Sequence, residues 1–342
     1  MKYLSVCSGI EAATVAWPNW QPVAFSEIEK FPSQVLAHHY PDVPNLGDMT
    51  KFKEWNIDSI DLLVGGTPCQ SFSVAGLRKG LDDPRGNLAL VYLAIAERFK
   101  PQWIVWENVP GVLSSNRGRD FGAFLGALGQ LGYGFAYRVL DAQFFGVAQR
   151  RRRVFVVGYL GDWRRAAAVL FERESLCRDN PPSRETRQNI AQCLTRGVGQ
   201  RYDPETETLL AQSVGSLCAR TGQSISVQDA AQGHLLAEPI ALAENTIGRQ
   251  PLNGGNGTGY TEGGPMYTLN ATGVHGVANA MAVRRLTPTE CERLQGFPDR
   301  YTDIQPNGKQ TPDGPRYKAL GNSMAVPVMR WIGKQIDAVQ EL

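Results

Sequence analysis

The stretch that decides the fold class is Asp61–Ser73, which reads DLLVGGTPCQSFS. A short apolar run that ends in two glycines is typical of a buried strand followed by a loop. Cys69 follows a proline inside that polar, glycine-led loop rather than lying within an apolar segment. A cysteine in such a position suits an exposed and activated thiolate, so Cys69 is a candidate nucleophile.

Similar apolar runs recur on both sides of this stretch and alternate with helical patterns. We expect strands at Tyr3–Cys7, Val23–Glu27, Asp61–Gly65, Trp103–Glu107, Tyr137–Leu140 and Val154–Tyr159. We expect helices at Glu11–Trp17, Phe31–His39, Asn87–Phe99 and Asp120–Leu131. This alternation predicts an α/β fold, with a mostly parallel sheet covered by helices on both faces. Ligands bind such sheets at the carboxyl ends of the strands.

Three segments at predicted strand ends favour a nucleoside cofactor. After the first strand, the single glycine of Cys7–Glu11 lets backbone N–H groups approach a ligand, and Ser8 with Glu11 can cap the next helix. Glu27 ends the second strand, where a carboxylate can accept both hydroxyls of a ribose. Asp48 can accept from an exocyclic amine. Each feature alone is common in proteins without such a ligand. Their order along the chain, a turn followed by Glu27 and then Asp48, favours a nucleoside-binding site over an ordinary turn with surface carboxylates.

Charged residues stand beside two later strands. Glu107 ends one apolar run, and Gln149–Arg153 directly precedes the last predicted strand. With Arg164 and Arg165, the arginine run concentrates positive charge in a chain whose net charge is only +2. Such runs are more often solvated surface than phosphate-binding patches, so charge alone does not indicate a nucleic-acid partner.

The composition is that of an ordinary globular protein. With 342 residues, 42% hydrophobic and 20% charged, the chain can form a large domain and a smaller one. The first residues resemble neither a secretory signal nor a membrane span, so we expect a cytoplasmic protein. Six cysteines are widely spread without a C-x-x-C pair, which predicts reduced thiols and neither a disulfide framework nor a zinc site.

The composition changes after Leu160. A charged, proline-containing stretch leads into a region rich in Gly, Ser, Thr and Asn up to about Ala280. This region is either a disordered insertion or a small, loop-rich β domain, and its short apolar pieces favour the domain. Regular structure returns at Thr287–Glu290, whose Thr-Pro-Thr-Glu sequence is a capping box that starts a helix. We expect a last helix at about Ser323–Val339.

Four motifs in this order resemble those of the DNA (cytosine-5)-methyltransferase family: Pro68-Cys69-Gln70, Glu107-Asn108-Val109, Gln149-x-Arg151-x-Arg153 and Gly321-Asn322-Ser323. The resemblance implies a Rossmann-like catalytic domain, made of residues 1–160 and 284–342, that binds S-adenosylmethionine and no metal. It also implies a variable target-recognition domain at 161–283, which contains no motif that identifies a target sequence.

The resemblance further implies a role for each matching residue. Cys69 would attack C6 of a cytosine flipped out of double-stranded DNA, and Glu107 would hydrogen-bond or protonate N3, so that C5 becomes nucleophilic. Arg151 and Arg153 would orient the base and its phosphate. The implied cofactor positions are Cys7, Ser8, Gly9, Ile10, Glu27, Ile28, Asp48, Met49, Asn322, Ser323 and Met324. The implied base pocket adds Pro68, Gln70, Asn108 and Val109.

Three residues depart from the family pattern. Cys7 stands where phenylalanine is common, Glu11 where glycine is common, and Ile28 where a tryptophan often packs on the adenine. These departures concern the packing and affinity of the cofactor, because none of them is a reacting group.

Three other functions fit parts of the sequence: an RNA cytosine methyltransferase, a catalytically silent DNA-binding protein of the same fold, and a nicotinamide oxidoreductase. A variable region of over a hundred residues favours DNA over RNA, and the presence of Cys69 and Glu107 argues against a silent protein. The single-glycine turn lacks the G-x-G-x-x-G spacing of dinucleotide sites. We therefore expect a monomeric enzyme that methylates cytosine within a short DNA sequence, of the kind found in restriction-modification systems.

Overall fold

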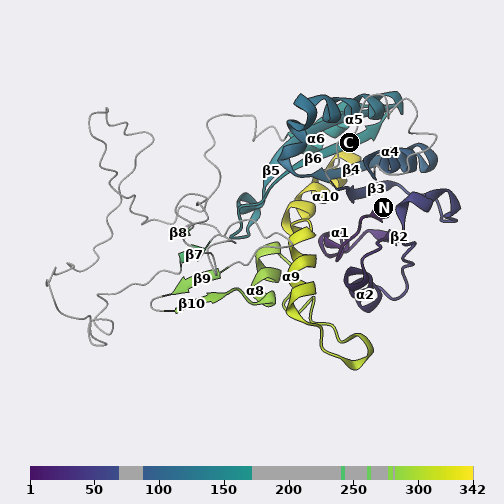
Figure 1. Cartoon of the computed structure of the whole chain (residues 1–342). Helices are drawn as coiled ribbons and strands as arrows, with labels where there is room; N and C mark the ends of the chain where they lie inside the picture. Colours follow the sequence, from purple (N-terminus) through teal and green to yellow (C-terminus); the bar gives the residue numbers. More distant parts are fainter. Residues whose placement is uncertain (69–87, 172–239, 243–259, 263–275, 280–281, 342) are drawn as a thin grey trace, which may run out of the picture.

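The computed structural model describes residues 1–68, 88–171, 240–242, 260–262, 276–279 and 282–341, and the statements below concern these residues (Figure 1). Cys69, Gln70 and most of the expected target-recognition domain lie outside the described residues.

A six-stranded sheet forms the centre of the fold, in the order β2-β1-β3-β4-β6-β5. Neighbouring strands are parallel from β2 to β4, whereas β6 runs antiparallel to both β4 and β5. The expected mostly parallel α/β sheet is therefore confirmed, with β6 as its reversed strand. The strands are β1 (Lys2–Val6), β2 (Gln21–Ser26), β3 (Leu62–Gly66), β4 (Trp103–Asn108), β5 (Tyr133–Asp141) and β6 (Arg152–Leu160).

Helices cover both faces of this sheet because successive strand residues point to opposite sides. In β3, Leu63 contacts one buried cluster, with residues of α4 (Leu88–Phe99) and α5 (Arg119–Gln130). Its neighbours Leu62 and Val64 contact the other cluster. That second cluster includes residues of α1 (Ala12–Ala16), α6 (Trp163–Leu170) and α10 (Val326–Gln340).

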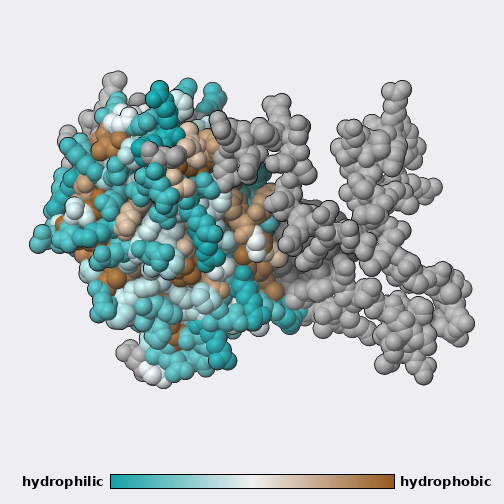
Figure 2. Space-filling view, turned by 180° about the vertical axis from the view of Figure 1, so that it is seen from behind, coloured by the Kyte–Doolittle hydropathy of each residue, from teal (hydrophilic) through white to brown (hydrophobic). Residues whose placement is uncertain are grey.

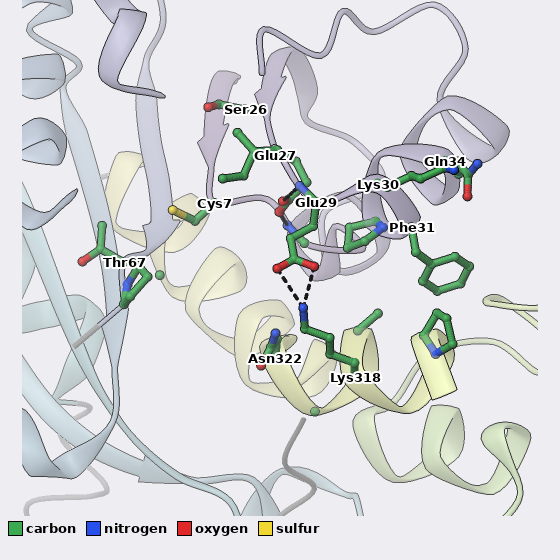
Figure 3. A pocket seen from close by; sticks show the side chains of 18 of the residues that line it. Cys7, Ser26, Glu27, Glu29, Lys30, Phe31, Gln34, Thr67, Lys318 and Asn322 are labelled. Atoms are coloured by element: carbon green, nitrogen blue, oxygen red, sulfur yellow. Dashed lines mark hydrogen bonds and ion pairs between the residues drawn. The ribbon is translucent and has the colours of Figure 1, made fainter. Parts of the chain in front are cut away.

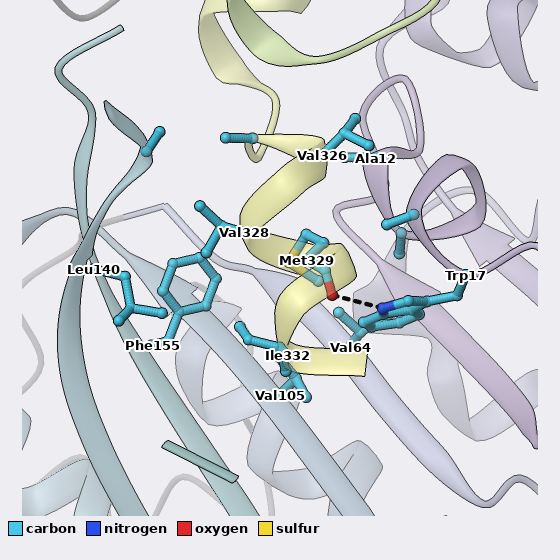
Figure 4. Close-up of a cluster of buried hydrophobic side chains, with 14 of the residues drawn as sticks. Ala12, Trp17, Val64, Val105, Leu140, Phe155, Val326, Val328, Met329 and Ile332 are labelled. Atoms are coloured by element: carbon cyan, nitrogen blue, oxygen red, sulfur yellow. Dashed lines mark hydrogen bonds between the residues drawn. The ribbon is translucent and has the colours of Figure 1, made fainter. Parts of the chain in front are cut away.

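The two ends of the described chain pack against each other in the second cluster. Figure 4 shows α10 between Trp17 on one side and Phe155 on the other. The indole Nε1 of Trp17 donates a hydrogen bond to the carbonyl of Met329, at 2.7 Å. Residues more than three hundred positions apart thus form one core, which joins the C-terminal segment to the N-terminal domain.

Shorter elements complete the described part of the chain. The other helices and 3-10 turns are α2 (Lys30–His39), η1 (Met49–Glu54), η2 (Pro110–Leu113), η3 (Ser115–Gly118), η4 (Ala142–Phe145), α8 (Pro288–Gln295), η6 (Pro306–Gly308) and α9 (Asp313–Asn322). A second, antiparallel sheet has the order β10-β9-β7-β8 and consists of β7 (Ile240–Leu242), β8 (Tyr260–Glu262), β9 (Gly276–Asn279) and β10 (Ala282–Arg285).

The expected helix start at Thr287 is confirmed. Its hydroxyl accepts from the N–H of Glu290, and the Glu290 carboxylate accepts from the N–H of Thr287. The last helix begins later than expected, at Val326 instead of Ser323. The physical reason is Pro327, which a helix tolerates in its first turn but not in its interior.

Helices α6 and α9 and the first half of β5 were not expected. The strand expected at Tyr137–Leu140 begins at Tyr133 and therefore includes Gly134. The start of α6 packs closely against this glycine, since a Cβ there would lie 2.1 Å from the backbone nitrogen of Trp163. Helix α6 lies beyond the composition change at Leu160 and packs against β5 and β6. Helix α9 precedes α10. Gly134 inside β5 and the Gly314-Pro315 pair in the first turn of α9 both weaken the sequence signal, because such residues are typical of bulges and turns.

Hydrophilic residues predominate on the side of the described residues that Figure 2 shows, and apolar residues form small patches among them. None of the helices within the described ranges is long and apolar enough to cross a membrane.

Candidate active site

A cleft of about 1240 Å³ opens at the carboxyl edge of the sheet (Figure 3). It is lined from the ends of β1, β2, β3 and β4, from the start of β6 and from α9. Because β6 is antiparallel to β4, its first residues lie at the same edge as the last residues of β4, and Asn108 pairs with Val154. The topology therefore gathers around one cavity the motifs that the sequence places at separate strand ends.

Glu107 is a largely buried carboxylate of this cleft. Its side chain is 12% exposed, and its Oε1 lies 3.0 Å from Nε of Arg153. Burial raises the pKa of Glu107, while the guanidinium groups of Arg153 and Arg151 act in the opposite direction. A carboxyl group with a raised pKa can donate a hydrogen bond or a proton to a ring nitrogen.

The end of β3 is fixed to the end of β4 beside Glu107. The hydroxyl of Thr67 accepts from the indole Nε1 of Trp106, and its carbonyl accepts from Nδ2 of Asn108, each at 3.0 Å. Asn108 is only 3% exposed, so this expected base-pocket residue holds the neighbouring strand in place. Pro68, the last described residue before Cys69, lines the cleft.

The two arginines of the third motif have different surroundings. Arg153 pairs with Glu107. Arg151 is 3% exposed, and its Nη2 donates to the carbonyls of Gly321 and Ser323, at 3.1 and 2.6 Å. Both arginines line the cleft, and Arg151 also attaches the start of β6 to the C-terminal segment.

Two carboxylates expected to bind a nucleoside lie at another part of the cleft. Glu27 accepts from the N–H of Gly9 at 2.8 Å and from the N–H of Glu29 at 2.7 Å, one bond to each oxygen. Asp48 caps η1 by accepting from the N–H of Thr50 at 2.9 Å. Met49 also lines this part of the cleft. Because each carboxylate oxygen can accept a further bond, both groups remain able to receive hydroxyl or amine donors.

The three other residues expected near the nucleoside differ in exposure. Ile28 lines the cleft and is 73% exposed, so its side chain offers an apolar surface to a ligand. Ile10 is fully buried in the core and lines neither this cleft nor the smaller cavity beside it. Cys7 lines the cleft, and burial together with the Glu27 carboxylate raises the pKa of its thiol to about 12. Cys7 is therefore an uncharged thiol at neutral pH.

Of Ser8 and Glu11, the two residues expected to cap the helix after β1, only Glu11 does so. Glu11 is the N-cap of α1, and its carboxylate accepts from the N–H of Thr14. Ser8 instead connects strands, since its hydroxyl donates to the carbonyl of Ser5 at 2.9 Å and accepts from the N–H of Ser26 at 3.1 Å.

The C-terminal motif reaches the site from α9. Asn322 is exposed and lines the cleft. Ser323 and Met324 line a second cavity of about 40 Å³, which is also bordered by Ser8 and Glu107. The turn after β1 and the segment after α9 are thus brought together beside the buried carboxylate.

The outer wall of the cleft was not predicted from the sequence. Figure 3 shows Glu29, beside the start of α2, facing Lys318 of α9 across the cavity, with hydrogen bonds of 2.8 and 2.7 Å. Lys309 also lines the cleft. The pair Pro312-Asp313, a proline followed by an acidic residue, is a helix-start signal that could have indicated α9.

Within the described residues, no group of three or more His, Cys, Asp or Glu side chains could hold a metal ion.

Comparison with known proteins identifies the family. A family model described as C-5 cytosine-specific DNA methylase matches residues 1–338. The chain is 38% identical to a protein of Escherichia phage P1 named DNA N-6-adenine-methyltransferase; the match covers 98% of this chain but only 61% of that relative. It is 30% identical to the type II methyltransferase M.SsoII of Shigella sonnei, over 91% of this chain and 72% of the relative.

Two solved structures share the fold along their whole length. One is described as a DNA modification methyltransferase encoded within an Escherichia coli prophage; it covers 100% of both chains with a TM-score of 0.61 and 17% identity. The other, the S. pombe Dnmt2 methyltransferase, also covers 100% of both chains, with a TM-score of 0.55 and 13% identity. From the match over residues 1–338, the chain belongs to the C-5 cytosine-specific DNA methylase family.

Proposed function

We propose that this protein transfers a methyl group from S-adenosylmethionine to C5 of a cytosine in double-stranded DNA, with Cys69 as the nucleophile. The observation that carries the proposal is the buried Glu107, paired with Arg153 in the same cleft as Glu27 and Asp48. Pro68, which precedes Cys69 in the sequence, lines that cleft.

The residues of the cleft fit S-adenosylmethionine. Glu27 and Asp48 have lone pairs for the ribose hydroxyls and the adenine amine, and the exposed Ile28 can pack on the adenine ring. Asn322 lines the same cavity. When bound, the cofactor supplies an electrophilic methyl group on a sulfonium.

Cytosine C5 needs activation before it can accept that methyl group. The Cys69 thiolate adds to C6, while Glu107 donates a hydrogen bond or its proton to N3, and the electron pair of the C5–C6 double bond becomes available at C5. After C5 is methylated, water takes the C5 proton, any proton on N3 returns to Glu107, and expulsion of the Cys69 thiolate restores the ring. A carboxyl group with a raised pKa, such as that of Glu107, is suited to the donor role.

A cytosine must leave the base stack to reach Cys69, which costs on the order of a few kcal/mol. We propose that Arg153, with Arg151, orients the flipped base and its phosphate, and that Val109, 39% exposed in the cleft, contacts the base. We also propose that residues 161–283 contain the target-recognition region. The enzyme is proposed to be a monomer that acts on DNA in the cytoplasm.

The name of the phage P1 relative raises adenine as an alternative target. Methylation of an exocyclic amine requires neither a thiol that adds to the ring nor a proton donor for N3. Since the match covers 61% of that relative, a part of that protein has no counterpart in this chain. The Cys69 and Glu107 pair is the reason to favour cytosine.

The proposal is tested by expressing the wild type and Cys69→Ser in a host that lacks both 5-methylcytosine and N6-methyladenine. Nucleosides from DNA and from RNA are then quantified by mass spectrometry, and modified sites are mapped. We expect 5-methylcytosine in DNA, at a recurring short sequence, with the wild type only. N6-methyladenine, or 5-methylcytosine confined to RNA, would contradict the proposed substrate, and a fully active Cys69→Ser would contradict the nucleophile.

A further inference from the structure

Glu11 is a buried carboxylate on the turn between β1 and α1. It is 1% exposed and has left-handed backbone angles, with φ 64°. One carboxylate oxygen accepts from the Ser5 hydroxyl at 2.8 Å, and the other from the N–H and hydroxyl of Thr14, both at 3.2 Å. Left-handed angles disfavour a side chain, so these hydrogen bonds hold a residue where glycine would be free of strain.

The surroundings of Glu11 supply no positive charge within the described residues. The described ion pairs do not include Glu11. The titratable groups that interact with it are the hydroxyls of Tyr3 on β1, Tyr40 after α2 and Tyr301 after α8, and burial raises the pKa of each of them. These phenols are uncharged at neutral pH, and the cavity is also bordered by Glu107, whose pKa is raised by burial, and by the uncharged thiol of Cys7.

Glu11 borders the 40 Å³ cavity described above, between the turn after β1 and the segment after α9. This cavity adjoins the large cleft, since both are lined by Cys7, Gly9, Gly66, Glu107 and Asn322. The nucleoside carboxylates Glu27 and Asp48 line only the large cleft. The small cavity thus lies between Glu107 and Gly9, whose N–H donates to Glu27.

The shape of the proposed cofactor determines what enters this cavity. Its sulfur carries three groups: the ribose, the methyl group and the methionine chain. If the ribose lies at Glu27 and the methyl group faces the base at Glu107, the methionine chain is the group left to extend past Gly66 and Asn322. That chain ends in an α-carboxylate and an α-ammonium, and the ammonium is a cation of the kind that the described surroundings of Glu11 do not supply.

We propose that Glu11 receives the α-ammonium of S-adenosylmethionine and that it becomes ionised when the cofactor binds. The inference rests on the proposed function. Burial raises the pKa of Glu11 to about 7, with its hydrogen bonds opposing the shift, so the free protein holds a proton there over much of the neutral range. An ammonium partner favours the carboxylate, and binding therefore releases this proton to the buffer.

The test is calorimetric titration with S-adenosylhomocysteine, which carries the α-ammonium but no transferable methyl group. Titrations at pH 7 in buffers of different ionisation enthalpy give the number of protons released. We expect about half a proton per ligand for the wild type, falling toward zero at pH 9, because a group with pKa about 7 is half protonated at pH 7. The ligand 5′-methylthioadenosine, which has no amino-acid group, should release none.

Two variants identify the source of the proton. Glu11→Gln should abolish the release and weaken S-adenosylhomocysteine binding about 10-fold, with 5′-methylthioadenosine affinity unchanged. Glu107→Gln is the matched control, because its carboxyl borders the same cavity, and it should keep the release. Release that persists in Glu11→Gln, or is absent in the wild type, would overturn the inference. A wild type that binds S-adenosylhomocysteine without releasing a proton contradicts this inference alone, whereas a wild type that binds none contradicts the proposed function.

Discussion

Gly66 offers a direct test of the position of the Glu107 carboxylate. A Cβ at residue 66 would lie 2.9 Å from Oε2 of Glu107 and 3.2 Å from the terminal methyl of Met324. Ordinary contact begins at 3.4 Å, so the carboxylate oxygen must move by about 0.5 Å. Because both neighbours are the far ends of flexible side chains, Gly66→Ala should cost less than about 1 kcal/mol of unfolding free energy. A displacement of this size at a reacting group should lower kcat about 10- to 100-fold.

Single-turnover methyl transfer and thermal unfolding measure these two effects separately. Gly126→Ala is a suitable control: it lies in α5 with nothing within 4 Å of its Cβ, and should be stabilised by about 0.5 to 1 kcal/mol without loss of activity. A Gly66→Ala enzyme with the wild-type kcat would refute the placement of the Glu107 carboxylate. A large loss of stability in Gly66→Ala would refute the claim that the side chains of Glu107 and Met324 can move aside at little cost.

Three further changes test other parts of the structure. Gly333→Ala would place a Cβ 2.2 Å from the indole nitrogen of Trp17, so we expect urea unfolding to show a loss of about 2 to 4 kcal/mol; unchanged stability would mean that α10 packs differently. Arg153→Ala removes a cation that lowers the pKa of Glu107, so the alkaline limb of the pH profile of methyl transfer should move to higher pH, and an unmoved limb would argue against Glu107 as the proton donor. Burial raises the pKa of Glu11 from an ordinary 4.5 to about 7, so the folded protein binds this proton more tightly than the unfolded chain does. The stabilisation that the bound proton gives to the folded state is therefore lost as the pH rises through 7. Without cofactor, Glu11→Gln should therefore be more stable than the wild type at pH 8, by at most about 3 kcal/mol, with little difference at pH 4; equal urea midpoints at pH 8 would contradict this.

The sequence predicted the parts of the site that depend on local pattern. Glu27 and Glu107 follow apolar runs, and parallel strands bring their carboxyl ends to one edge, so their meeting in a cleft followed from topology. The reversed direction of β6 could not be read from its apolar pattern, yet it is what brings Arg153 to Glu107.

The environment of Glu11 shows the limit of the sequence more clearly. The sequence predicts that Glu11 caps the next helix and alters the packing of the cofactor, but it does not predict that this carboxylate is buried. Its burial depends on tyrosines at positions 3, 40 and 301 meeting around one turn, which is a property of tertiary packing. A sequence cannot show that such a carboxylate has no cation beside it.

The packing of α10 on α1 has a consequence for how the enzyme is made. Trp17 leaves the ribosome 312 residues before its partner Met329. Until α10 arrives, the face of the sheet that includes Val64 and Phe155 has no helix from the C-terminal segment to cover it. The carbonyls of Gly321 and Ser323 that bind Arg151 also reach the cleft late. A nascent chain therefore cannot complete this cleft before the segment that contains α9 and α10 has been synthesised.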